Sequence, residues 1–129
     1  MTTLFTPQNA PLSYLATPYT NYPGGITEAY VAAARLAAKL INAGIKIYSP
    51  ICHCHPIAIY GGLAGLAHEQ WLRFDESMMR VADVLIVAHM PSWQESKGIA
   101  AEIAFFGEAG KPIFDCEPKS LRLTKWSGK

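Results

Sequence analysis

Short apolar segments alternate with helix-like segments along most of this chain, and no other feature restricts its possible folds as strongly. The segments with the length and composition of buried strands are 12–17, 45–49, 83–89 and 112–115. The segments with apolar residues at helical spacing are 27–44, 67–82 and 98–109. Strands that alternate with helices form a parallel sheet with right-handed crossovers and helices on both faces. We therefore predict an α/β fold.

The chain has the size of one domain. With 129 residues it can bury a single hydrophobic core, and it contains no internal repeat. We expect one three-layer domain over residues 1–129, with a flavodoxin- or Rossmann-like parallel sheet of four to five strands. Its termini, 1–11 and 117–129, are expected to be irregular. In such sheets, ligands bind outside the carboxyl ends of the strands.

The charge and the cysteine content restrict the partners that the chain can have. Its formal net charge is +1 and it has no run of Lys or Arg, so we expect no binding to long nucleic acid. No apolar run reaches the roughly 20 residues that span a bilayer, so we expect no membrane association. An odd number of cysteines, 3, without an apolar leader indicates a reducing compartment. We expect a cytoplasmic protein that binds a small molecule.

The segment Cys52-His53-Cys54-His55 invites a metal-binding interpretation. Read as an extended loop, it points its cysteines to one side and its histidines to the other, so four ligands cannot converge. We predict no metal there, and instead a loop that covers a pocket, with His53 touching the substrate. The glycines of 61–65 lack the spacing of a dinucleotide fingerprint, so neither NAD nor ATP is expected as a cofactor.

Two carboxylates occupy apolar helical surroundings. Three and four positions away from Asp75 lie Trp71, Leu72, Met78 and Met79, and the same positions around Glu102 hold Gly98, Ile99, Phe105 and Phe106. A carboxylate held against apolar surface loses hydration, which raises its pKa, and such groups cluster at functional sites. An exposed or capping carboxylate is the alternative for each. Glu102 also lies about one turn into the helix that follows the third strand, at the expected ligand edge.

The start of that helix suits an anion. Ser96 fits the N-cap position, and the amides after it, with Lys97 beside them, are free to hold a phosphate. A role for Ser96 as a helix cap alone explains the residue equally well. Trp93 in the preceding loop could stack on a nucleobase or simply pack.

Four motifs, taken in order, resemble the nucleoside 2-deoxyribosyltransferase-like family, which includes the 2′-deoxynucleoside 5′-phosphate N-hydrolases. They are Tyr14-Leu15-Ala16-Thr17-Pro18, Asp75 with Asp83 eight residues later, Ser96-Lys97-Gly98-Ile99-Ala100-Ala101-Glu102, and Gly110-Lys111-Pro112-Ile113. The resemblance spans residues 12–115. A Ser-Pro-Ile-x-His segment at 49–53 and a Trp-x-x-Ser-x-Gly segment at 93–98 make the chain most similar to a bacterial and phage branch of that family.

The resemblance implies an enzyme that acts on the N-glycosidic bond of a deoxyribonucleoside or its 5′-monophosphate. According to this resemblance, Glu102 attacks the anomeric carbon of the sugar, and Asp75 serves first as general acid and then as general base. Tyr14 forms a hydrogen bond with Glu102. Taken with the features above, the expected substrate-binding residues are Thr17, Pro18, Thr20, His53, Trp93, Ser96, Lys97 and Gly98.

The resemblance also bears on the type of reaction. Ser96 stands where the transferases carry Asp, as it does in the nucleotide hydrolases, so hydrolysis is slightly favoured over transfer. Relatives of this type assemble as dimers or larger rings, which implies a homo-oligomer. The alternative from a different class is a non-catalytic nucleotide-binding module with the same fold.

Overall fold

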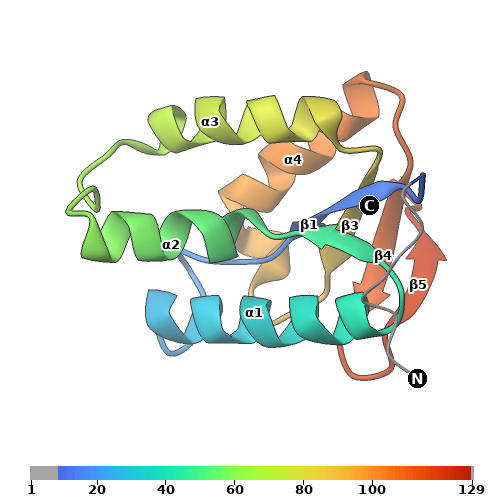
Figure 1. Cartoon of the computed structure of the whole chain (residues 1–129), viewed down its shortest axis with the longest axis horizontal. Helices are drawn as coiled ribbons and strands as arrows, with labels where there is room; N and C mark the ends of the chain where they lie inside the picture. The colour runs from blue at the N-terminus through green and yellow to red at the C-terminus, as the bar shows by residue number, and fades with distance from the viewer. Residues whose placement is uncertain (1–8, 129) are drawn as a thin grey trace.

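A five-stranded sheet with helices packed around it makes up the protein in the computed structural model, which describes residues 9–128 (Figure 1). In chain order, the elements are β1 (Leu12–Ala16), α1 (Ile26–Asn42), β2 (Lys46–Tyr48), α2 (Pro50–Tyr60), α3 (His68–Val81), β3 (Val84–Ala88), the 3-10 turn η1 (Trp93–Glu95), α4 (Lys97–Glu108), β4 (Ile113–Glu117) and β5 (Arg122–Lys125).

The strands follow the order β2-β1-β3-β4-β5 in the sheet. β1 pairs in parallel with both β2 and β3, and β3 pairs in parallel with β4. Only the last pairing in this order, β4 with β5, is antiparallel. The predicted α/β fold with a Rossmann-like sheet of four to five strands is therefore confirmed.

Two apolar cores pack on the opposite faces of the sheet. Along β1 the side chains alternate, so that Tyr14 belongs to the core under α3 and α4, whereas Leu15 belongs to the core under α1. On the first face, Met79 of α3 and Phe106 of α4 are fully buried, and on the second Leu40 of α1 is. Strands that are buried on both faces are apolar almost throughout, which is why the sequence identified them.

The carboxyl ends of β1 and β3 lie next to each other, with Ala16 opposite Val87. From there the chain continues towards α1 on one face of the sheet and towards α4 on the other. In a doubly wound sheet, this is the switch point at which a crevice opens between the two connections.

The helix α2 is a correction to the sequence analysis, which read Cys52–His55 as an extended loop. Ser49 caps α2 by accepting a hydrogen bond from the Cys52 amide at 3.2 Å, and Pro50 occupies the first helical turn. The pair Ser49-Pro50 is thus a helix start signal. It was missed because α2 contains Pro56 and has no clear apolar stripe.

The tail at 117–129 was expected to be irregular, and this expectation was wrong for its middle part. Residues Arg122–Lys125 form β5, which continues the sheet beyond β4. All four β5 residues are exposed, so no buried face gives the strand an alternating apolar pattern. Its pairing comes from the turn at Glu117–Leu121, in which the Leu121 amide bonds the Glu117 carbonyl at 2.8 Å.

The helices have the modest length of those in globular domains. The longest of those described, α1, has 17 residues. Across residues 9–128, none combines the length and the apolar character that crossing a bilayer requires.

Candidate active site

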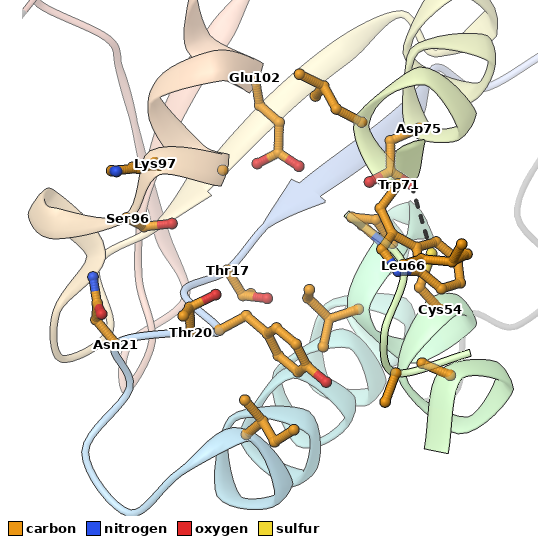
Figure 2. Close-up of a pocket in the computed structure, with 18 of the residues that line it drawn as sticks. Thr17, Thr20, Asn21, Cys54, Leu66, Trp71, Asp75, Ser96, Lys97 and Glu102 are labelled. Carbon is orange, nitrogen blue, oxygen red and sulfur yellow. Dashed lines mark hydrogen bonds between the residues drawn. The ribbon is translucent and has the colours of Figure 1, made fainter. Parts of the chain in front are cut away.

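A cavity of about 530 Å³ opens at the carboxyl ends of β1 and β3. Thr17 follows β1, Cys54 comes from α2, Asp75 from α3, and both Ser96 and Glu102 from the start of α4. Figure 2 shows these side chains around one space, with the two carboxyl groups pointing into it. The volume and location are those of a small-molecule site.

Glu102 is the more deeply buried of the two acids. Its side chain lies in the second turn of α4 and is only 8% exposed. Burial raises the pKa of the Glu102 carboxyl well above its usual range, and the nearby charge of Asp75 raises it further. A hydrogen-bonding contribution from Tyr14 acts in the opposite direction. The apolar surroundings that the sequence indicated for Glu102 are thus present.

Asp75 lies across the cavity from Glu102, on the face of α3 that looks towards α2 and α4 (Figure 2). The thiol of Cys54 donates a hydrogen bond to its Oδ1 at 3.7 Å. Asp75 is half-buried, so it is more accessible than Glu102. The two acids therefore share one cavity but differ in how much solvent reaches them.

Tyr14 is fully buried and does not line the cavity. Its ring packs against Tyr48 and Phe106, with centroids 5.7 and 5.8 Å away. Within residues 9–128 its hydroxyl has no hydrogen bond of good length and angle, yet it lies near enough to Glu102 to lower the pKa of that carboxyl. The bond between Tyr14 and Glu102 is therefore not fully formed in this site. Catalytic hydrogen bonds are often loose in a ligand-free site and tighten around the substrate.

The start of α4 forms the polar end of the cavity. Ser96 caps the helix, because its Oγ accepts a hydrogen bond from the Ile99 amide at 3.1 Å. Thr17 is only 5% exposed, and its Oγ1 has no partner among residues 9–128. A buried hydroxyl without a partner calls for a ligand or a water molecule. Asn21 joins this end of the cavity to the loop before α4 through a hydrogen bond from its Nδ2 to the Glu95 carbonyl at 3.4 Å.

The cavity brings together most of the residues that the sequence singled out. Those that line it are Thr17, Thr20, Asp75, Ser96, Lys97, Gly98 and Glu102. Tyr14 and Pro18 are buried and do not line it.

Two of the expected substrate-binding residues lie elsewhere. His53 is exposed and stacks on Phe74 at 5.3 Å, because the helical backbone of α2 turns it away from the cavity. Trp93 stacks on His89 at 4.1 Å and meets Trp126 edge-on, so its ring packs and does not line the cavity. Of the two roles considered for Trp93, stacking on a nucleobase or packing within the protein, its position corresponds to packing.

The sequence analysis missed several cavity residues on α2 and α3. Trp71 lies four positions before Asp75 on the same helix, so helical spacing alone would have placed it beside that acid. Cys54 could be placed only once α2 was recognised as a helix. Tyr19 also lines the cavity, and its hydroxyl lies 2.6 Å from Nδ1 of the buried His55.

The side chains of Cys52–His55 diverge. Cys54 bonds Asp75 and His55 bonds Tyr19, while His53 lies on the exposed face of α2. In the described part of the chain, no three His, Cys, Asp or Glu residues are grouped as metal ligands.

A comparison with protein families gives one match. The family described as "Domain of unknown function (DUF1937)" matches residues 12–117, which include every strand except β5 and every cavity residue named above. The chain therefore belongs to this family. A comparison with curated proteins finds no match.

We predict that Glu102→Gln stabilises the protein increasingly as the pH rises above the usual range of a glutamate. The folded protein retains the Glu102 proton to higher pH than the unfolded chain. The free energy of unfolding of the wild type therefore falls as the pH rises from the pKa of the unfolded chain to that of the folded protein, whereas the variant has no such loss. Below both values the carboxyl is protonated in either state, and the variant gains little. Each unit of difference in pKa corresponds to about 1.4 kcal/mol. Urea denaturation from about pH 4 to about pH 9 measures the effect.

The matched control is Glu108→Gln, which removes an exposed carboxyl from the same helix. Its effect on stability should be small over the same pH range. A Glu102→Gln variant whose relative stability stays flat or falls over the same range would contradict the account of the buried acid.

Proposed function

We propose that this DUF1937 member cleaves or exchanges the N-glycosidic bond of a deoxyribonucleoside or its 5′-monophosphate. The reaction passes through a glycosyl-enzyme intermediate on Glu102. The observation that carries the proposal is the arrangement of Glu102 and Asp75, two acids of unequal burial that point into one cavity at the switch point. Pairs of carboxyl groups in different environments are typical of glycosidic bond cleavage.

The two ends of the cavity differ in polarity, and this supports a nucleotide-like ligand. Ser96 and Asn21 lie at one end, and Trp71 and Leu66 at the other, with Glu102 between them (Figure 2). The polar end has free amides at the N-terminus of α4, which suit a phosphate. The apolar end has a flat aromatic ring, which suits a nucleobase. A ligand that joins these two groups through a sugar would place its anomeric carbon near the acids.

The resemblance to the nucleoside 2-deoxyribosyltransferase-like family supports the same reaction. The residues that carry it at the site are Thr17, Asp75, Ser96 and Glu102, and all four line the cavity. They come from three separate parts of the chain: the end of β1, α3 and the start of α4. The motifs were identified from the sequence alone, and the folded chain brings their residues together around one cavity.

In the first step, a carboxylate oxygen of Glu102 forms a bond to the anomeric carbon as the bond from that carbon to the base nitrogen breaks. Asp75 transfers its proton to the departing base, which leaves neutral. In the second step, a water molecule attacks the anomeric carbon, Asp75 takes up the proton of this water, and the bond to Glu102 breaks. A free base in place of the water gives transfer. Tyr14 orients Glu102 in both steps.

This sequence of steps needs Glu102 ionised while Asp75 is protonated. In the ligand-free site, burial and the charge of Asp75 favour a protonated Glu102. A protonated Asp75 no longer exerts that charge, so the two acids share one proton and titrate as a pair. Positive charge that develops on the sugar in the transition state then favours ionised Glu102.

The presence of Ser96 at the start of α4 favours hydrolysis of a nucleoside monophosphate over transfer. A serine hydroxyl and free amides accept a phosphate, whereas an aspartate at the same place would repel it. A cytoplasmic location and a homo-oligomeric assembly remain predictions from the sequence.

We predict that the protein releases free base from at least one member of a panel of deoxynucleosides and their 5′-monophosphates. Glu102→Gln should lower the rate on the order of a thousandfold or more, because the amide cannot form the glycosyl ester. Chromatography of the free base measures the release, and a second free base added to the mixture separates transfer from hydrolysis. Glu108→Gln, with the same change at an exposed position of α4, should keep the wild-type rate.

Release that persists undiminished in Glu102→Gln would remove Glu102 from the nucleophilic role. Binding of a panel member without any release of base, measured by calorimetry, would favour the non-catalytic nucleotide-binding module.

A further variant tests the phosphate end. Ser96→Asp keeps a side chain that caps helices but adds a negative charge at the start of α4. We expect the KM for the monophosphate to rise about tenfold, or about 1.4 kcal/mol, while the KM for the nucleoside hardly changes. Ser77→Asp, which adds the same charge to an exposed position of α3, should change neither. Equal effects of Ser96→Asp on both substrates would contradict a phosphate at this position.

A further inference from the structure

Cys54 contacts one of the two acids directly. It lines the cavity from α2, opposite α3, and its Sγ lies 3.7 Å from Oδ1 of Asp75 (Figure 2). The two residues are 21 positions apart in the chain, so this contact comes from the way in which α2 and α3 are folded beside one another. The reaction described above makes no use of this thiol.

The direction of the Cys54–Asp75 hydrogen bond is fixed by chemistry. Burial, followed by the charge and the hydrogen bond of Asp75, raises the pKa of the Cys54 thiol to about 12. At neutral pH the sulfur therefore carries its proton and donates it to the carboxyl oxygen. A thiol of this kind is a poor nucleophile, so a role in orienting Asp75 suits it better than a covalent role.

The two tyrosines beside the acids, Tyr14 and Tyr48, are uncharged at neutral pH. Burial, Cys54 and Asp75 all raise the pKa of Tyr48 from β2, and burial and the two acids raise that of Tyr14 from β1. Both hydroxyls are buried and lack a well-formed hydrogen bond among residues 9–128. The Cys54 thiol donates a hydrogen bond to Asp75, while Glu102 from α4 supplies the opposing charge.

We propose that Cys54 is a positioning residue for Asp75. Its thiol occupies Oδ1, so that the acidic proton of Asp75 is carried by Oδ2, from which it passes to the departing base. The inference rests on the proposed function, because it assigns to Cys54 a part in the proton transfer from Asp75. The alternative is a thiol that merely fills space between α2 and α3, as buried cysteines often do.

The kinetic test compares Cys54→Ala with Cys54→Ser in the base-release assay. Loss of this donor removes one contact that orients the Asp75 carboxyl, so Cys54→Ala should lower kcat about tenfold with little change in KM. A donor stabilises the carboxylate form, and its loss should also move the descending limb of the pH–rate profile to higher pH. Cys54→Ser keeps a hydrogen-bond donor, so both its kcat and the position of its descending pH limb should be close to those of the wild type. Cys52→Ala, a thiol on the same helix outside the cavity, is the control for helix packing.

Equal losses in the alanine and serine variants, with an unmoved pH profile, would indicate packing alone and overturn the proposal. So would a Cys54→Ala variant whose kcat and pH profile match those of the wild type.

A second measurement does not depend on turnover. If Cys54 donates to Asp75, then Asp75→Asn removes the charge that holds the thiol proton, and alkylation of Cys54 by iodoacetamide should become about threefold faster or more. Fragment-ion mass spectrometry separates Cys54 from Cys52, whose rate should not change. An unchanged Cys54 rate would overturn the contact itself. If the wild type releases no base from any panel member, the proposed function fails, and this rate alone decides whether Cys54 orients Asp75.

Discussion

The burial of Glu102 beside Asp75 is the interaction on which this account of the site depends. Two carboxyl groups in one poorly hydrated cavity cannot both ionise at low cost, so each controls the proton of the other. The neighbouring Tyr14 and Tyr48 hydroxyls and the Cys54 thiol keep their own protons at neutral pH. Three neutral donors therefore lie beside the pair of acids, which is a suitable environment for moving one proton to a leaving group and back.

The fold explains how such a costly arrangement is held in place. Glu102 is carried by α4, whose start is fixed by the Ser96 cap and whose apolar face packs Phe106 against the sheet. Asp75 is carried by α3, whose last turn is fixed when the Lys111 ammonium group bonds three carbonyls, those of Met79, Arg80 and Ala82, at 2.7 to 2.9 Å. Both helices belong to the same face of the sheet, so the core determines the distance between the acids.

The sequence predicted the features that follow from local spacing. Helical neighbours identified Asp75 and Glu102 as sequestered acids, and the apolar strands identified the parallel sheet. It did not predict α2, because that helix contains Pro56 and has no clear apolar stripe. The role of Cys54 and the outward position of His53 both depend on α2, so neither could be derived before that helix was known. The exposed strand β5 is held in place by its pairing with β4. Neither strand propensity nor an alternating apolar pattern in the sequence predicts this pairing.

The most direct measurement of the shared proton is an NMR pH titration of the protein labelled with ¹³C at the glutamate carboxyl carbons. The account predicts that one carboxyl signal, lost in Glu102→Gln, titrates well above the other glutamates. In Asp75→Asn the same signal should titrate at lower pH, because the charge that opposes ionisation of Glu102 is gone. Glutamate signals that all titrate together, and do not respond to Asp75→Asn, would contradict the central claim.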